Sequence, residues 1–145
     1  MEILMRKAAF LFLCLVLSSP ASAGPNKAFA AATAPEQSFD ICHADDVMTA
    51  IACAMKKCTS AGGADCVVVT ACPDGWSGAM GVTTGEIEFT DAVCGAPDKA
   101  SVIASLTAFC KGSKKFAKAC NLSSVWDPQG QETSIQKMLD PKKLK

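Results

Sequence analysis

Apolar residues recur at helical spacing in two segments of the chain, residues 45–58 and 97–110. Asp46 and Asp98 would stand in the first turn of these segments, where a carboxylate interacts favourably with the positive end of the helix dipole. We therefore predict two helices, each with one apolar face. The faces consist of Val47, Ile51, Ala54 and Cys58 in the first helix, and of Val102, Ile103, Leu106 and Cys110 in the second.

The segments that follow the predicted helices have the pattern of strands. Residues 66–70 are a β-branched run typical of a buried strand, and residues 120–126 show a weaker version of it. Between the helices, residues 76–82 and 86–90 are predicted to form two strands joined by a turn, the second alternating apolar with acidic residues. The pattern predicts an α+β fold, with two helices on one face of a small, mainly antiparallel sheet.

The two helical segments resemble each other when the sequence is shifted by 52 residues. Six identities fall in a window of 17 residues, and two of the six are cysteines. Each copy consists of a cysteine, a helix, a second cysteine at the helix end and a third that enters a strand. We infer an internal duplication. The shift aligns Cys42 with Cys94, Ala44 with Ala96, Asp46 with Asp98, Ile51 with Ile103, Ala52 with Ala104 and Cys58 with Cys110.

The N-terminus has the layout of a secretory signal peptide. Arg6 and Lys7 precede an apolar run over residues 8–17, and small residues lead up to a cleavage point after Ala23. A second small-x-small site at residues 28–30 leaves the cleavage position open. The apolar run is shorter than the roughly twenty residues that span a bilayer, so we expect no transmembrane segment in the mature chain. The predicted division is a signal peptide over 1–23, a flexible leader over 24–38, the duplicated Cys-rich domain over 39–126 and a polar, Lys-rich tail over 127–145.

Eight of the nine cysteines lie beyond the signal peptide. An even number of cysteines in an exported chain predicts a framework of about four disulfides. No C-x-x-C pair is present, which argues against thioredoxin-like exchange, a zinc ribbon and covalent haem attachment. The cysteines expected to pair are Cys42, Cys53, Cys58, Cys66, Cys72, Cys94, Cys110 and Cys120.

Two of the pairings are predicted and two are left open. We expect Cys58–Cys66 and Cys110–Cys120, each across the loop between a helix and the strand that follows it. Helix length favours one set of further bridges. Cys42, at the start of the first helix, would lie beside Cys72, at the far end of the strand that begins at Cys66 and returns along that helix. The duplication favours a rival pairing, since two of the cysteines have no counterpart in the other copy. The alternatives are Cys42–Cys72 with Cys53–Cys94, and Cys53–Cys72 with Cys42–Cys94.

The arrangement of these motifs resembles a family of small bacterial secreted domains of unknown function. In that family an alanine-rich helix ending in cysteine is followed by a Cys-Val-Val strand, and the unit is repeated. The resemblance covers residues 42–126 and implies a fold and an exported location, without residue roles. Members usually open with a glycine- and aromatic-rich hairpin, where this chain has its Ala-rich leader. The motifs are Ala50-Ile51-Ala52, Cys58, Gly62-Gly63, Cys66-Val67-Val68-Val69 and Cys72, then Ile103-Ala104, Cys110 and Cys120.

Charge is distributed unevenly along the mature chain. Residues 24–98 contain three lysines and ten acidic residues, a net charge of −7, whereas residues 99–145 contain nine lysines and three acidic residues, a net charge of +6. The polarity could orient a charged partner, or the two halves could attract each other. The only arginine, Arg6, leaves with the signal peptide, so no guanidinium remains for bidentate recognition of bases or phosphate. We expect no specific binding of nucleic acid.

The residues suited to catalysis or metal binding are few. His43 is the single histidine, and Asp45 or Asp46 could orient it as a general base, although no nucleophile is recognisable. Thioether ligands near His43 could form a Cu(I) site, but packing explains them more simply. The acid pair Glu86 and Glu88 is interpreted as a solvated strand face. The methionines considered as Cu(I) ligands are Met48, Met55 and Met80.

Together these observations favour an exported, non-catalytic binding or inhibitory module of the cell envelope or secreted space. Trp76 and Trp126 are the candidate contact residues for a partner, because tryptophan is enriched in binding hot spots. We expect the partner to be another protein, and we expect no cofactor and no metal. The alternatives are an extracytoplasmic hydrolase that uses His43 with Asp46, and a structural envelope component.

Overall fold

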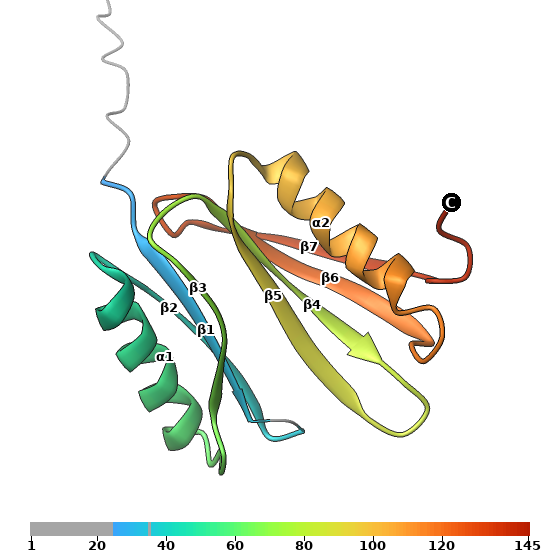
Figure 1. The fold of residues 1–145 in the computed structure, drawn as a ribbon, viewed down its shortest axis with the longest axis horizontal. Helices are drawn as coiled ribbons and strands as arrows, with labels where there is room; N and C mark the ends of the chain where they lie inside the picture. The colour runs from blue at the N-terminus through green and yellow to red at the C-terminus, as the bar shows by residue number, and fades with distance from the viewer. Residues whose placement is uncertain (1–24, 35) are drawn as a thin grey trace, which may run out of the picture.

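The computed structural model describes residues 25–34 and 36–145 (Figure 1). The predicted signal peptide, residues 1–23, lies outside the described residues. The order strand, strand, helix, strand occurs twice, and a further strand follows. The elements are β1 (Ala28–Ala34), β2 (Ser38–Ala44), α1 (Val47–Ser60), β3 (Val67–Cys72), β4 (Trp76–Thr83), β5 (Glu88–Ala96), α2 (Lys99–Gly112), β6 (Ala119–Trp126) and β7 (Glu132–Leu139).

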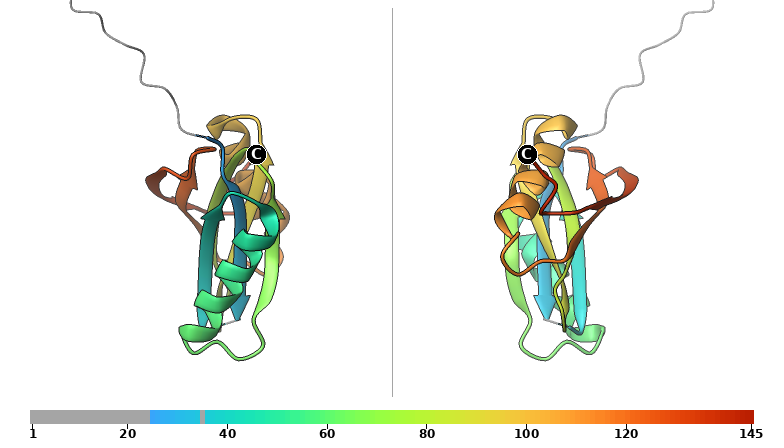
Figure 2. Two further views of the ribbon diagram at one scale, coloured as in Figure 1. Left: turned by 90° about the vertical axis from the view of Figure 1, so that its left-hand side faces the viewer. Right: turned by 90° about the vertical axis from the view of Figure 1, so that its right-hand side faces the viewer.

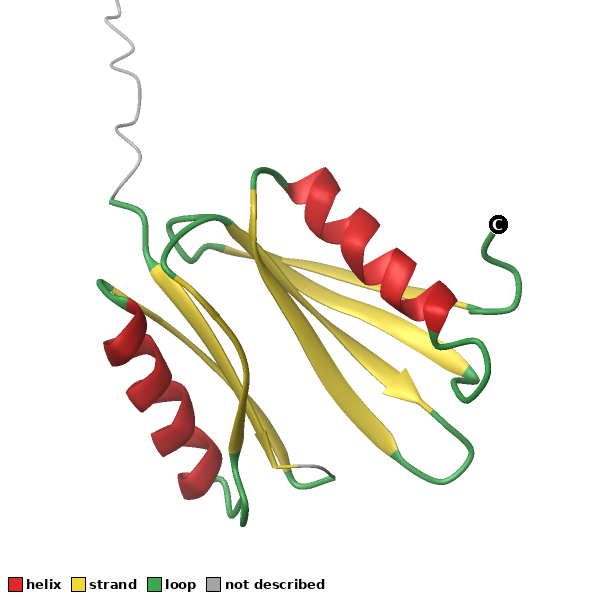
Figure 3. Ribbon diagram, viewed as in Figure 1, coloured by secondary structure: helices red, strands yellow, loops and turns green. Residues whose placement is uncertain are grey.

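The strands form two antiparallel sheets, which face each other with one helix on each outer face (Figures 1 and 3). The first sheet has the order β2-β1-β3 and contacts α1, and the second has the order β5-β4-β6-β7 and contacts α2. The predicted α+β class with disulfide staples is confirmed. The single predicted sheet is in fact two sheets, so the helices lie on opposite sides of the molecule. No helix in the described residues is long and apolar enough to cross a bilayer.

Three cores hold these four layers together. The core under α1 is built mostly from alanine, whereas the core under α2 contains larger side chains such as Met80, Leu106 and Leu122. The third core lies between the two sheets, where Phe29 and Trp126 pack against Ala31, Ala79 and Ala92. Alanine on the facing strands lets the backbones approach closely, so two aromatic rings fill much of the space between the sheets.

The prediction of a flexible leader over residues 24–38 is wrong, because β1 is the central strand of the first sheet. Its residues face α1 on one side and the second sheet on the other, and nearly all of them are fully buried. A strand buried on both faces has no alternation of apolar and polar residues. Alanine also has a low propensity for strands, so the sequence Ala-Phe-Ala-Ala-Ala-Thr-Ala gave neither signal of a strand.

The polar tail predicted over residues 127–145 also contains regular structure. Its strand β7 pairs with β6 at the edge of the second sheet, and most of its side chains are exposed. An exposed edge strand needs few apolar residues, which explains its polar composition. Leu139 and Pro141 are buried and attach the end of the chain to the core under α2.

Both predicted helices are present, and each begins two residues later than expected. Asp46 and Asp98 are their N-caps and accept hydrogen bonds from the backbone N–H groups of Thr49, at 2.9 Å, and Ser101, at 2.7 Å. The pKa of the Asp46 carboxyl group is held below the usual value for aspartate, first by a hydrogen bond from the Thr49 hydroxyl and then by that from the Thr49 N–H. The hydrogen bond from the Ser101 N–H lowers the pKa of Asp98 in the same way.

Four disulfides join the eight cysteines, and two of them are those predicted, Cys58–Cys66 and Cys110–Cys120. Both alternatives for the remaining four cysteines are wrong, since the bridges are Cys42–Cys53 and Cys72–Cys94. Cys42 lies in β2 instead of at the helix start, and α1 folds back over β2, so the Cα atoms of Cys42 and Cys53 are 5.9 Å apart. Cys72 and Cys94 link β3 to β5 and therefore join the two sheets.

Candidate binding cleft between the two sheets

His43, the first candidate for catalysis, is packed among aromatic rings between the sheets. Its ring lies edge-on to Phe29, with the centroids 5.3 Å apart, and its centroid is 6.2 Å from that of Trp126. A Cβ atom on Gly130 would be 3.0 Å from the His43 ring, so the β6–β7 loop lies directly against it. The Nε2 atom is buried and has no hydrogen-bond partner among the described residues. His43 is therefore a half-buried ring that packs against Phe29 and Trp126.

Burial lowers the pKa of His43 below its usual value, because the charged imidazolium would lose its hydration. The negative charge of Asp127 opposes this shift, and the positive charge of Lys57 adds to it. The folded protein consequently holds His43 in the neutral form at neutral pH, which suits a ring packed against Phe29 and Trp126.

We expect stability to fall as the pH is lowered from neutral through about 6.5, the ordinary pKa of histidine. In this range the unfolded chain takes up a proton at His43 that the folded chain does not, so the free energy of unfolding decreases with decreasing pH. For one proton the slope cannot exceed about 1.4 kcal/mol per pH unit. Urea unfolding at a series of pH values, with His43→Phe as the control, measures the effect. Identical pH profiles for the two proteins between neutral pH and pH 5 would contradict the assignment.

Asp46, the proposed acid partner of His43, is committed to the start of α1. Its carboxylate accepts hydrogen bonds from the backbone N–H of Thr49 at 2.9 Å and from the Thr49 hydroxyl at 2.6 Å. In the described part of the chain, no hydrogen bond joins Asp46 to His43. The two residues on which a hydrolase would depend thus have separate roles, one in helix capping and one in packing.

The methionines considered as copper ligands lie in three different environments. Met48 is 72% exposed on α1. Met55, on the same helix, is partly buried against the core between α1 and the first sheet. Met80, in β4, is fully buried in the core under α2. Within residues 25–34 and 36–145, no three His, Cys, Asp or Glu side chains are grouped closely enough to hold a metal ion. The three thioethers are accounted for by their separate positions in the fold.

The two tryptophans are also held by the cores. Trp126 is only 7% exposed and belongs to the core between the sheets, whereas Trp76 is partly buried against the core under α2. A ring as enclosed as that of Trp126 cannot offer its face to a partner in this fold.

A cleft of about 250 Å³ lies between the β1–β2 turn and the start of β5. The two sheets diverge toward this end of the molecule. At the opposite end β3 and β5 approach each other and are joined by the Cys72–Cys94 bridge (Figures 1 and 3). We call this opening the hairpin cleft. It is lined by Thr33, Glu36, Gln37, Ser38 and Phe39 on one side and by Glu88, Phe89 and Thr90 on the other.

Strand register places the polar and apolar lining residues side by side. Thr33 in β1 is directly opposite Phe39 in β2, and Gly81 in β4 is directly opposite Thr90 in β5. A Cβ atom on Gly81 would be 3.3 Å from the Glu88 carboxylate, so the missing side chain at Gly81 leaves room for that group. The second sheet thus offers the cleft the Glu88 carboxylate, with space beside it at Gly81.

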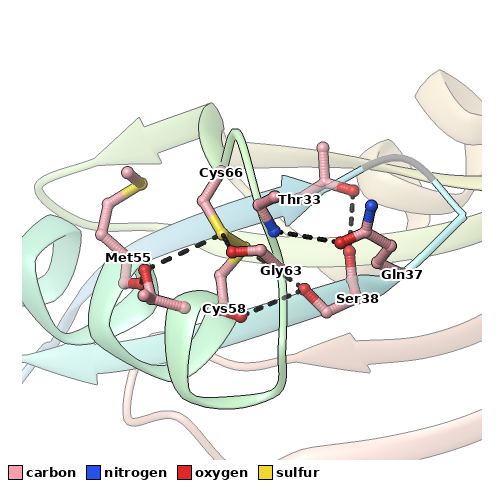
Figure 4. Close-up of a disulfide and its surroundings, with 9 residues drawn as sticks. Thr33, Gln37, Ser38, Met55, Cys58, Gly63 and Cys66 are labelled. Carbon is pink, nitrogen blue, oxygen red and sulfur yellow. Dashed lines mark hydrogen bonds between the residues drawn. A yellow bond between two sulfur atoms is a disulfide. The ribbon is translucent and has the colours of Figure 1, made fainter.

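The β1–β2 wall of the hairpin cleft is fixed to the Cys58–Cys66 disulfide (Figure 4). The Ala64 N–H donates to Gln37 Oε1 at 3.0 Å, and the Ser38 hydroxyl donates to Cys58 Sγ at 3.2 Å. A side chain at Gly63 would approach the Cys58 carbonyl oxygen to 2.8 Å, so only glycine allows the loop to pack this closely. Hydrogen bonds therefore hold the β1–β2 wall against a loop that is closed by a disulfide.

The acidic groups of the hairpin cleft have no neutralising partner. The ion pairs in residues 25–34 and 36–145 are Lys27–Asp45 and Lys143–Asp140, and neither involves the cleft. Glu36 and Glu88 are both exposed at its edge, and the partly buried Phe39 ring lies in the space between the sheets. The neighbouring Phe89 ring packs against the core under α2, on the other face of the second sheet. The cleft can thus offer a cationic group two carboxylates and an apolar group one aromatic ring.

Four of the eight cleft residues escaped prediction because they lie in the segment interpreted as a leader. Glu88 was recognised, but only as one of two acids on a solvated strand face. No signal in a single sequence shows that residues 36–39 and 88–90, which are about fifty positions apart, line one opening. No protein-family model matches the chain, and neither the curated proteins nor the solved structures include a significant match to it.

Proposed function

We propose that the chain is an exported, non-catalytic binding module whose hairpin cleft binds a basic side chain on an extended segment of another protein. The observation that carries the proposal is a cleft in which two exposed carboxylates, neither of them in an ion pair with another described residue, lie near the ring of Phe39. Lysine and arginine have an apolar stem and a cationic head, which is the combination that this lining complements.

The size of the cleft supports a side chain as the ligand. Pockets for drug-sized molecules usually have volumes of about 300–1,000 Å³, and the hairpin cleft, at about 250 Å³, is smaller and open to solvent. A single long side chain of a partner protein is of suitable size. The surrounding surface would then contact the partner's backbone.

The disulfides support an exported location. All eight cysteines in the described residues are paired, and structural disulfides persist mainly in oxidising compartments outside the cytoplasm. No thiol among them is left for nucleophilic chemistry. The packing of His43 and the capping by Asp46 support the non-catalytic part of the proposal, because each residue already has a structural reason to be where it is.

Titration with the peptide acetyl-Leu-Lys-Leu-amide, followed by the amide NMR signals of the protein, tests the site. We expect shifts at Thr33, Phe39 and Thr90, and weaker binding of the neutral analogue that has glutamine in place of lysine. Glu88→Gln should weaken binding by about threefold, and the double replacement with Glu36→Gln by about tenfold, as partly exposed ion pairs contribute up to about 1 kcal/mol each.

The matched control is Glu86→Gln, which removes the same charge from the neighbouring turn but does not line the cleft. It should bind the peptide nearly as well as the unmodified protein. Equal affinity for the lysine and glutamine peptides, or shifts that map away from the cleft, would rule out this binding site.

A further inference from the structure

The loop between α2 and β6, residues 113–118, combines lysine with an exposed aromatic ring. Phe116 is 54% exposed, and Phe109, in the last turns of α2, is 37% exposed. The lysines around them are all exposed, and none forms an ion pair with another described residue. The lysines are Lys111, Lys114, Lys115 and Lys118.

The loop is anchored, so the exposure of Phe116 does not come from a loose segment. Ser113 and Ala117 are buried, and the Ala117 N–H donates to the Ser113 carbonyl oxygen at 2.9 Å. The Lys118 N–H donates to the carbonyl oxygen of Thr83 at 2.8 Å, and the Cys110–Cys120 bridge closes the loop. A fixed backbone therefore projects the Phe116 ring outward.

The corresponding loop of the first unit shows that the fold does not need these residues. The loop between α1 and β3 has the sequence Ala61-Gly62-Gly63-Ala64-Asp65, with no lysine and no aromatic residue. It joins a helix to a strand across a disulfide in the same way. Lysine and phenylalanine in the second loop consequently require an explanation other than the chain path.

The C-terminal residues place further exposed lysines near α2. The end of the chain passes beside α2 in Figures 1 and 2, where Leu144 packs against the core under that helix. Lys142, Lys143 and Lys145 are exposed on this segment, and Lys143 is partly neutralised by Asp140, 3.4 Å away. We call the α2–β6 loop, Phe109, Lys111 and these three lysines the basic face.

We infer that the basic face binds the surface of an anionic lipid bilayer, with Phe116 inserted among the lipids and the lysines at the headgroups. An isolated aromatic ring on a projecting loop suits insertion into an interface. Lysine ammonium groups are compact point charges that respond to a diffuse negative surface, whereas specific phosphate recognition favours arginine, which the described residues lack. Each lysine close to such a surface strengthens binding by about fivefold.

Co-sedimentation of the disulfide-bonded protein with vesicles tests the inference. We expect salt-sensitive binding to vesicles of phosphatidylglycerol mixed with phosphatidylcholine, and no binding to phosphatidylcholine alone. The double variant Lys114→Gln/Lys115→Gln should bind the anionic vesicles about 25-fold more weakly. Phe116→Ser should bind about tenfold more weakly, because it loses the apolar contribution.

The control is Lys56→Gln/Lys99→Gln, which removes two charges away from the basic face and should leave vesicle binding unchanged. Failure to bind anionic vesicles, or equal losses in the control, would overturn the inference. Binding to soluble polyglutamate without binding to vesicles would overturn it in favour of an acidic protein partner. The peptide that tests the hairpin cleft should bind all these variants equally, so the two proposals can fail separately.

Discussion

Phe29→Ala is expected to lower the free energy of unfolding by about 3–5 kcal/mol, the usual cost of deleting a buried phenylalanine ring. Phe29 is only 2% exposed and contacts His43 and Trp126 between the two sheets. Three of the neighbouring side chains, Ala31, Ala79 and Ala92, are too short to fill the cavity. Guanidinium unfolding monitored by tryptophan fluorescence measures the change, since Trp126 lies 5.9 Å from the lost ring.

Phe116→Ala provides the matched control, because it deletes the same ring from an exposed position. It should change the free energy of unfolding by no more than about 0.5 kcal/mol, as is usual for surface substitutions. Equal losses in the two variants would mean that the space between the sheets is not a packed core.

The helices were predictable because each has one buried face and one solvated face. That arrangement produces the 3.6-residue periodicity seen around Leu106 and Ala54, and the capping aspartates mark where each helix begins. The start of β5 was recognisable for a related reason, since acidic and apolar residues alternate there. The class of the fold therefore follows from local patterns.

The arrangement of the sheets was not predictable in this way. The strand β1 is buried on both faces and composed largely of alanine, so its sequence has neither alternation nor high strand propensity. Without β2, Cys42 had no correct position. Cys94 lay beyond the strand predicted over residues 86–90, whereas β5 extends to Ala96, and both alternatives for the remaining bridges failed. The missing strands β1 and β2 account for the error in sheet number, and the early end predicted for β5 adds to the errors in disulfide connectivity.

The candidate site depends on the same missing strands. Thr33, Gln37 and Phe39 line the hairpin cleft only because β1 and β2 form a hairpin opposite β5. The sequence did indicate that the charges are polarised. In the structure, acidic groups border the hairpin cleft and lysines lie on the basic face. A count of charges along the chain separates its two halves but does not show which residues of each half share a surface.

Removal of the Cys72–Cys94 bridge by replacing both cysteines with alanine is the second large effect that we expect. The bridge closes a loop of 22 residues, and the loss of this constraint on the unfolded chain should lower the free energy of unfolding by about 3 kcal/mol. The corresponding change at Cys58 and Cys66, which are 8 residues apart, should cost about 2.5 kcal/mol on the same basis. Guanidinium unfolding of both variants under non-reducing conditions measures the two losses.

The NMR signals of the cleft residues distinguish the roles of these two bridges more clearly than stability does. Cys72–Cys94 joins β3 to β5 at the end where the sheets approach, so its loss frees the sheets to change the width of the opening at the other end. Cys58–Cys66 fixes only the β1–β2 wall, through Gln37 and Ser38. We expect the Cys72→Ala/Cys94→Ala variant to shift the NMR signals of residues on both sides of the cleft, and the Cys58→Ala/Cys66→Ala variant to shift those of the β1–β2 wall alone. A variant without the Cys72–Cys94 bridge whose β5 signals stayed unchanged would show that packing of Phe29 and Trp126 is sufficient to hold the sheets at their distance.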